Sequence, residues 1–363
     1  MANEFHMKNY LINKKERLKG HFSTSKNWVE KNDKYLSPAF FIAGFILDNL
    51  TLTRIDMFFD NAILFGYLSL VAFSIIMMRA VKREGIVKYL PFVLQFAFGG
   101  LFSGYVIFYT KSASLASSWI FLFLLYGLFL GNERLRHYYK KSDFQIIIFF
   151  VAIFSFMIFF IPVLLKEMGW QIFILSGLVS LLVIYLFIFF TLKFSEVRGK
   201  RDFRNILVVY IIFNILYFTN IIPPVPLSLK NLELYHSVEK SFSGNYIVQK
   251  EVGAWSLFNK FTKTQNSSIY VYSSVFAPTD LNIDVVNVWR KYDEKKGEWV
   301  TRERITYSIK GGRSEGYRGY SFISNVETGK WKVSIETERG QTLGVIKFKV
   351  IEGKPELETE EIR

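Results

Sequence analysis

The sequence predicts a multi-domain membrane protein in which an α-helical transmembrane bundle of about seven spans precedes an all-β, immunoglobulin-like sandwich. The 363 residues are 51% hydrophobic and 18% aromatic, which is more apolar than an ordinary soluble domain. Long apolar runs fill residues 36–222, and this region is expected to cross the membrane. After residue 268 the pattern changes to short β-rich runs separated by turn residues, which is typical of a sandwich.

The apolar runs are each roughly 17 to 22 residues long, the length that a helix needs to cross a hydrocarbon core about 30 Å thick. The predicted spans lie near Leu36–Leu52, Asn61–Met78, Tyr89–Tyr109, Leu115–Gly131, Phe144–Leu165, Gln171–Leu192 and Asn205–Ile222. Asp48 and Asn49 interrupt the first span, so its limits are the least defined. Residues 1–35 precede it as a basic tail.

Lysine and arginine collect on alternate connections between these spans. The second, fourth and sixth connections carry thirteen basic residues, whereas the first, third and fifth carry only Arg54, Lys111 and Lys166. Because cytoplasmic loops retain positive charge, the even connections and the tail 1–35 are predicted to be cytoplasmic. Seven crossings then place residue 223 onward outside. The basic excess lies at the inner membrane face, so the predicted partner there is the lipid bilayer and not nucleic acid.

The second half begins with the stretch "PPVPLSLKN", whose prolines prevent the last helix from continuing. Residues 223–267 are predicted as a proline-rich exit and linker, and residues 268–351 as the sandwich, with an alternative start near residue 230. A half-closed barrel is the alternative fold. Two sets of residues alternate with period two, as in strands with one buried face: Trp331, Val333 and Ile335, and Ile346, Phe348 and Val350. Residues 352–363 lack an apolar pattern and are predicted to be disordered.

Two further segments belong to this half. Residues 245–249 are an optional additional strand. The stretch "EVGAWSLFNKFTKTQ" spaces Trp255, Phe258 and Phe261 three residues apart, which suits either a helix lying on the outer leaflet or a segment packing its aromatic rings under the sheet.

Several phrases resemble a bacterial family of membrane proteins catalogued as Domain of Unknown Function 2914. They are "NIIPPVPLSLK", "YHSVEK", "VFAPTDL", "WRKYDEKKGEWV", "SIKGGRSEGYRGYS" and "GKWKVSIETERGQTLG". The resemblance covers roughly residues 220–350. It implies a multi-pass protein of the bacterial cytoplasmic membrane with an exported β module, and it implies no activity and no catalytic residue.

The stretch "SIKGGRSEGYRGYS" is the first candidate site. Gly311, Gly312 and Gly316 permit backbone conformations in which amides converge, and Arg313 and Arg318 could grip phosphate or carboxylate beside Tyr317. The structural alternative is a glycine-rich hairpin in which Tyr317 and Tyr320 pack and the arginines pair with Glu303 or Glu315. This alternative is the more common use of such a loop.

Other candidates are fewer. His236 lies beside Ser237 and Glu239, but sequence neighbours rarely form a catalytic triad, so a hydrogen-bonding role is favoured. Asp48 is an intramembrane acid and therefore a functional candidate. Trp289, Trp299 and Trp331 are expected in the sandwich core and not on a sugar-binding face. Gly100 and Gly104 have the G-x-x-x-G spacing, which favours packing inside the bundle over association of protomers in a homo-oligomer.

The sequence contains few residues that could form a catalytic site. The chain has no cysteine, and its four histidines are scattered, so the sequence predicts no metal site and no cofactor. A non-enzymatic protein is therefore expected, whose exported module recognises an envelope protein, a lipid headgroup or an anionic wall polymer. The alternative is a transporter or lipid-handling protein with the β module as a cap, and an envelope enzyme using His236 or Asp48 ranks below both.

Overall fold

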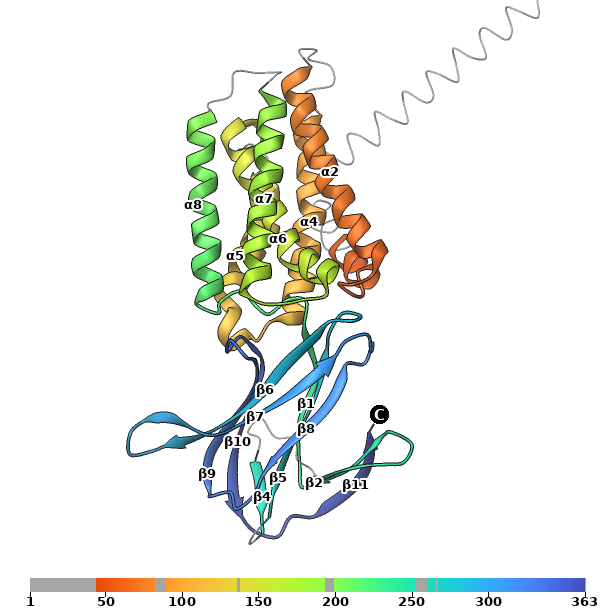
Figure 1. The fold of residues 1–363 in the computed structure, drawn as a ribbon, viewed down its shortest axis with the longest axis vertical. Coiled ribbons are helices and arrows are strands. Elements are labelled where there is room, and N and C mark those ends of the chain that lie inside the picture. The colour runs from red at the N-terminus through yellow and green to blue at the C-terminus, as the bar shows by residue number, and fades with distance from the viewer. Residues whose placement is uncertain are drawn as a thin grey trace, which may run out of the picture. The chain divides into compact units, whose positions relative to one another are not determined.

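A computed structural model of the chain describes residues 44–81, 89–135, 138–192, 199–252, 260–264 and 267–362. The chain divides into two compact units, Met1–Thr51 and Leu52–Arg363. In the first unit, the described residues 44–51 are helical. The second unit contains both a helical bundle and a β domain (Figure 1).

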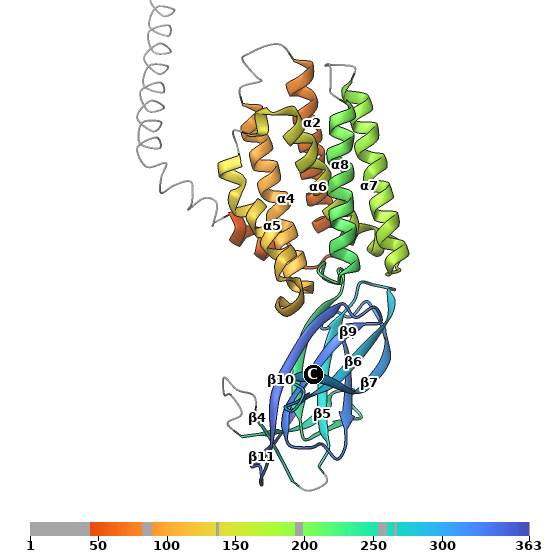
Figure 2. The same ribbon diagram turned by 90° about the vertical axis from the view of Figure 1, so that its left-hand side faces the viewer.

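Six long helices form the bundle, and they run alongside one another in both side views (Figures 1 and 2). They are α2 (Phe58–Ala80), α4 (Leu90–Ser112), α5 (Leu115–Leu135), α6 (Ser142–Leu165), α7 (Trp170–Thr191) and α8 (Gly199–Phe218). A short 3-10 helix, η1 (Tyr138–Lys140), precedes α6. Helices α2, α4, α5, α6 and α7 are long and apolar enough to cross a membrane.

These five helices coincide with the second to sixth predicted spans, so the prediction of seven is supported for five. Helix α8 replaces the predicted span Asn205–Ile222, but it starts at Gly199 and includes Arg201, Asp202 and Arg204, which are too many charges for an apolar span. Of the first predicted span, residues 36–43 lie outside the described residues.

Helices α4 and α6 form the centre of the bundle. Their apolar stretches are 67% and 72% buried, against 33% to 39% for α2, α5 and α7. The Tyr105 and Tyr109 hydroxyls of α4 donate to the backbone carbonyls of Ala152 and Ser155 on α6, each at 2.8 Å, which satisfies both donors in an apolar interior. Large hydrophobic side chains such as Phe65, Phe123 and Leu182 are exposed on the outer helices, as expected where lipid is the solvent.

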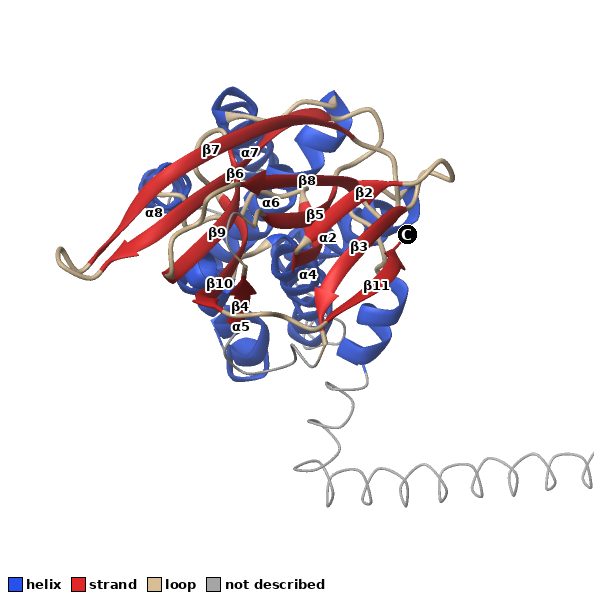
Figure 3. Ribbon diagram, turned by 90° about the horizontal axis from the view of Figure 1, so that it is seen from below, coloured by secondary structure: helices blue, strands red, loops and turns tan. Residues whose placement is uncertain are grey.

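The β domain consists of eleven strands among the described residues. They are β1 (Ser228–Tyr235), β2 (Ser237–Lys240), β3 (Tyr246–Glu251), β4 (Lys260–Lys263), β5 (Ile269–Phe276), β6 (Asn282–Asp293), β7 (Glu298–Lys310), β8 (Tyr317–Ile323), β9 (Gly329–Thr337), β10 (Thr342–Glu352) and β11 (Leu357–Ile362). They form three sheets, in the orders β1-β5-β8, β4-β10-β9-β6-β7 and β11-β3-β2. Figure 3 shows β2, β3 and β11 together beside the C-terminus.

One hydrophobic core lies between the first two sheets. The predicted alternation is confirmed, because Trp331, Val333 and Ile335 of β9 are buried in this core, as are Phe348 and Val350 of β10. The core also holds Trp289, whose indole nitrogen donates to the Ser321 hydroxyl at 3.2 Å. Both sheets therefore bury one face against the other.

The β domain starts close to the alternative start near residue 230, and it ends later than predicted. Strand β1 begins at Ser228, inside the predicted linker 223–267, and pairs with β5. Strand β11 occupies the tail that was predicted to be disordered. The strand has no apolar alternation by which it could be predicted, because ion pairs hold it in the sheet. The carboxylates of Glu358 and Glu360 lie 3.4 and 2.5 Å from the Lys250 ammonium of β3.

Two smaller predictions have different outcomes. Phe261 lies in strand β4 and is buried in the core, so the helical alternative for residues 251–265 is wrong at this residue. Trp255 and Phe258 lie outside the described residues. The optional strand at residues 245–249 is present as β3, Tyr246–Glu251.

The glycines of the G-x-x-x-G stretch pack against α2 of the same chain. A β-carbon at Gly100 would lie 2.5 Å from the Tyr67 ring, and one at Gly104 would lie 2.7 Å from Leu64. By contrast, a β-carbon at Gly127 of α5 would contact nothing within 4 Å. The stretch thus serves close packing of α2 and α4, the predicted use inside the bundle.

Substitution of Gly100 by alanine should therefore loosen the contact between α2 and α4. We expect Gly100→Ala to lower stability by about 1–3 kcal/mol, because the aromatic ring of Tyr67 must move. Thermal unfolding of the purified protein in detergent measures the effect. Gly127→Ala is the control, and an equal loss in both variants would contradict the packing role.

Candidate functional site

The loop between β7 and β8 connects two different sheets and is not a hairpin. Strand β7 pairs with β6, whereas β8 pairs with β5 across the core. The Gly311 amide donates to the Leu281 carbonyl at 2.8 Å and the Gly312 amide to the Ala277 carbonyl at 3.1 Å. These amides are thus occupied inside the protein, and an anion at this loop would meet side chains instead.

The glycines of this loop have steric and conformational roles. A β-carbon at Gly311 would overlap the Pro278 carbonyl oxygen, so only glycine fits against residues 277–278. Gly312 and Gly316 have φ angles of 106° and 88°, which glycine adopts without strain. The sharp crossing between the sheets therefore explains the glycine content.

The two arginines of the loop lie over tyrosine rings. The Arg313 guanidinium is 5.7 Å from the centre of the Tyr317 ring, and that of Arg318 is 5.7 Å from the centre of the Tyr246 ring. Within the described residues neither arginine forms an ion pair, so the predicted pairing with Glu303 or Glu315 is absent there.

Both arginines act electrostatically on Tyr246. Burial raises the pKa of the Tyr246 hydroxyl, and the positive charges of Arg318 and Arg313 oppose this rise. The hydroxyl donates to the Arg318 carbonyl at 3.3 Å, which ties β3 to β8. The structure thus places Arg318 against a tyrosine that sequence reasoning did not include, and Arg313 acts on the same tyrosine electrostatically.

Aromatic rings continue from Tyr246 over the outer face of the β1-β5-β8 sheet. Tyr246 contacts Tyr272 and Tyr320, with ring centres 5.5 and 6.2 Å apart, and Tyr270 stacks on Phe322 at 5.1 Å. Tyr320 and Phe322 are 40% and 48% exposed. We call this group, with Arg313, Tyr317 and Arg318, the arginine–tyrosine cluster.

A signal for this cluster is present in the sequence. In "IYVYSS", Ile269 and Val271 point into the core, so Tyr270 and Tyr272 must turn to the opposite face of the sheet. In "YRGYSF" the same alternation places Arg318, Tyr320 and Phe322 on that outer face. Sequence reasoning considered the tryptophans instead and missed this pattern.

The tryptophans divide between the core and the surface. Trp289 and Trp331 are buried in the core, as predicted. Trp299 is only partly buried and lies outside the core, where it contacts Tyr292 with ring centres 5.2 Å apart. The Lys332 ammonium lies 4.6 Å from the centre of the Trp299 ring.

His236 occupies a structural setting. Its Nε2 atom lies 3.0 Å from Oε1 of Glu251, and its ring stacks on Phe261 with centres 4.2 Å apart. The same Glu251 oxygen accepts the backbone amide of Thr262 at 2.5 Å. Burial lowers the pKa of His236, although Glu251 acts in the opposite direction. The histidine therefore joins β1, β3 and β4 as a hydrogen-bonding residue.

Polar residues of the helical region lie apart from the arginine–tyrosine cluster in sequence. Asp48 is partly buried in the helical residues 44–51 of the first unit. Asn214 donates to the Tyr210 carbonyl of its own helix at 2.8 Å, and Asn220 donates to the Arg339 carbonyl at 3.2 Å. Within the described part of the chain, no group of acidic and histidine side chains is arranged to hold a metal ion.

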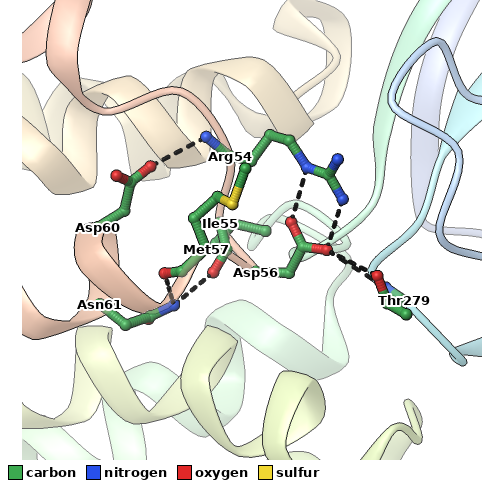
Figure 4. A network of polar contacts seen from close by, with 7 residues as sticks. All are labelled: Arg54, Ile55, Asp56, Met57, Asp60, Asn61 and Thr279. Carbon is green, nitrogen blue, oxygen red and sulfur yellow. Dashed lines mark hydrogen bonds and ion pairs between the residues drawn. The ribbon is translucent and has the colours of Figure 1, made fainter.

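A polar network joins the bundle to the β domain (Figure 4). Asp56, in the connection before α2, accepts two hydrogen bonds from the Arg54 guanidinium at 3.0 and 2.8 Å. It also accepts the Thr279 amide at 3.3 Å, from the loop between β5 and β6. The Asp60 carboxylate accepts hydrogen bonds from the backbone amides of Thr53 and Arg54 at 2.9 and 3.0 Å, and these bonds fix the backbone of the connection before α2.

A second contact reinforces this joint at the end of α8. The Arg339 guanidinium lies over the rings of Tyr217 and Phe218, 4.4 and 5.2 Å from their centres. The Gln341 amide donates to the Ile222 carbonyl at 3.2 Å. The loop between β9 and β10 is thereby attached to the chain that leaves the bundle.

Comparison with known proteins confirms the resemblance for the C-terminal module. Residues 283–350 match the family described as "Protein of unknown function (DUF2914)". No curated protein sequence matches the chain.

Three solved structures are similar to the chain, each with a TM-score of 0.23 or lower. The β-glucosidase from Listeria innocua in complex with gluconolactone is 11% identical with a TM-score of 0.19, over 33% of this chain and 16% of that chain. The β-glucosidase from Kluyveromyces marxianus is 12% identical with a TM-score of 0.17, over 36% and 15%. The alkylpurine DNA glycosylase AlkC of Pseudomonas fluorescens, bound to DNA, is 10% identical with a TM-score of 0.23, over 82% and 99%.

The setting of His236 predicts a pH dependence of stability. Because its folded pKa is lowered, the unfolded chain binds the proton more readily, so stability should fall as the pH drops below about 6.5. Thermal unfolding between about pH 7.5 and pH 5 measures this slope. His236→Gln keeps a polar partner for Glu251 without this titration, and it should flatten the curve. An unchanged slope in that variant would assign the pH dependence to other groups.

From the contacts between the bundle and the β domain, we expect replacement of Asp56 to lower stability more than replacement of Asp280. Asp56→Asn weakens a partly buried bidentate ion pair and should lower stability by about 1–3 kcal/mol. Asp280→Asn removes a pair with Lys166 in which both side chains are 55% exposed, and should change stability by about 0–1 kcal/mol. Asparagine suits the positive φ angle of Asp280, so backbone strain does not confound this control. Hydrogen exchange at residues 277–281 should increase only for Asp56→Asn, and equal increases would refute this role of Asp56.

Proposed function

We propose that this protein, whose residues 283–350 match the DUF2914 family, is a membrane-anchored recognition protein of the bacterial cytoplasmic membrane. In this proposal the helices anchor an immunoglobulin-like β domain, which lies outside the membrane and binds an anionic partner through the arginine–tyrosine cluster. The partner is an envelope protein, a lipid headgroup or a wall polymer. The proposal assigns the protein no catalytic step.

The anchor is supported by the five apolar helices and their exposed hydrophobic side chains. The orientation is supported by charge, because thirteen lysines and arginines lie in the even predicted connections and three in the odd ones. Helix α8 is not among these five because of the charges in its first turns, but in this proposal its apolar part after Arg204 is a further crossing that begins at the cytoplasmic side. With the first predicted span also counted, the β domain would lie outside.

The observation that carries the recognition function is the position of Arg313 and Arg318. Neither forms an ion pair within the described residues, and both lie against tyrosine rings, which hold the guanidinium groups without neutralising them. Exposed Tyr320 and Phe322 extend the surface beside them. Charge and aromatic rings at one place are typical of binding sites.

The alternative function, transport or lipid handling through the helices, would require a hydrated or lipid-filled route. Tyr105, Tyr109 and Phe159 fill the space between α4 and α6 with edge-to-face ring contacts, with centres 6.1 to 6.2 Å apart. This packing favours an anchor over a route between these two helices.

Replacement of both arginines tests the proposal. We expect Arg313→Ala with Arg318→Ala in the full-length protein to reduce capture of a binding partner from solubilised bacterial envelope at least roughly tenfold, as for loss of charged contacts. The unfolding temperature should stay close to that of the wild type. Lys295→Ala with Lys354→Ala removes the same charge from exposed positions outside the cluster and should leave capture unchanged. Equal capture by the wild type and the arginine variant would refute the recognition site.

The absence of cysteine allows a direct control for orientation. A single cysteine introduced as Lys354→Cys, an exposed position of the β domain, should react with a membrane-impermeant maleimide in cells with a permeable outer layer. Labelling only after lysis would place the β domain in the cytoplasm and overturn the orientation.

A further inference from the structure

The outer face of the five-stranded sheet carries a concentration of positive charge. Because Trp289, Trp331 and Phe348 point into the core, the residues next to them point to the opposite face. Six of its cations lie on adjoining strands and form the group that we call the basic sheet face: Lys260 on β4, Lys347 and Lys349 on β10, Lys330 and Lys332 on β9, and Arg290 on β6.

The strand register arranges these cations in two rows across the sheet. In one row Lys347 pairs with Lys332, and Lys332 pairs with Arg290. In the other row Lys349 pairs with both Lys260 and Lys330. Adjacent strands lie about 4.8 Å apart, and residues two apart along a strand are separated by about 6.7 Å, so the rows form a regular lattice of charge.

Such pairing is unfavourable for the sheet alone, because like charges directly opposite each other are destabilising. Glu336 contacts Arg290 at 2.8 Å, and Glu294 contacts Lys330 at 3.3 Å. Within the described residues the other four lysines form no ion pair. Burial lowers the pKa of Lys332, the charges of Arg290 and Lys347 lower it further, and the charge of Glu336 opposes this decrease. The protein itself therefore leaves most of this charge uncompensated.

A nearby groove shows the opposite arrangement. It has a volume of about 430 Å³ and lies beside the turn of the β6–β7 hairpin. Of its cations Lys291, Lys295 and Arg302, the first and last contact Glu327 of the neighbouring loop, and Asp293 and Glu294 also line the groove. Charge in the groove is thus neutralised within the protein, which leaves the basic sheet face as the stronger anion site.

Two aromatic rings border the rows on the side of β6 and β7. The Lys330 ammonium lies 5.2 Å from the centre of the Tyr292 ring, and the Lys332 ammonium lies 4.6 Å from the centre of the Trp299 ring. Tyr292 and Trp299 face each other across the hairpin register. The rings orient the two lysine side chains and give the face a defined edge.

We infer that the basic sheet face binds a linear, phosphate-bearing polyanion lying across the strands. A chain with repeated charges matches two rows of cations better than a single small anion does. Five of the six cations are lysines, which bind phosphate as point charges, and the single arginine, suited to bidentate carboxylate binding, already contacts Glu336. The face belongs to a different sheet from the arginine–tyrosine cluster, so the inference does not depend on the proposed function.

The test uses the full-length protein in discs of neutral lipid and fluorescently labelled, long-chain inorganic polyphosphate. Fluorescence anisotropy should show binding that weakens with salt. Lys332→Gln with Lys347→Gln should weaken it roughly tenfold at low salt and reduce the slope of log K against log salt by about 1.5. Without polymer the variant should unfold at the wild-type temperature or above, because a like-charged pair is removed. Polyphosphate should raise the unfolding temperature of the wild type more than that of the variant.

Lys310→Gln with Lys354→Gln is the matched control, because it removes two exposed lysines outside the basic sheet face and should keep wild-type binding. Arg313→Ala with Arg318→Ala should also keep it, which separates this site from the arginine–tyrosine cluster. Triphosphate and orthophosphate should bind progressively more weakly than the polymer. Equal binding of poly-glutamate, binding only to phosphatidylglycerol vesicles, or an equal loss in the Lys310 and Lys354 control would each overturn the inference.

Discussion

The period of two along each strand is the constraint on which the surfaces of the β domain depend. A strand that buries alternate residues in a shared core must turn the intervening residues outward. In β5 this rule buries Val271 and Val275 in the shared core and turns Tyr270 and Tyr272 to the opposite face, where Tyr272 packs against Tyr246 of β3. In β9 it buries Trp331 and exposes Lys330. The aromatic surface and the basic sheet face are thus consequences of how the core is filled.

The joint between the bundle and the β domain gives these surfaces a defined attachment. Asp56 connects Arg54 to the backbone of Thr279, and Arg339 covers the end of α8 from the loop between β9 and β10. These contacts come from loops of both sheets. They attach the β domain to the helices in addition to the covalent connection of the chain near Ile222.

Much of the architecture could be predicted from the sequence because apolar length and strand alternation are local signals. Five helices were found at their predicted positions, and the inward residues of β9 and β10 were identified. Helix α8 and strand β11 differ because charge overrides the local pattern. In α8, Arg201 and Asp202 extend the helix beyond its apolar part, and in β11 the pairing of Glu360 with Lys250 replaces hydrophobic burial.

By itself the sequence determined that apolar helices precede a strand-rich region, and it identified Arg313, Tyr317 and Arg318 as neighbours. Only the tertiary structure decided that their loop crosses between sheets, that Tyr246 of β3 contacts Arg318, and that lysines of three strands form rows with Arg290 of β6. The reason is physical. Alternation tells which side of a strand a residue occupies, but the pairing of distant strands, set by the whole core, decides which residues meet on that side.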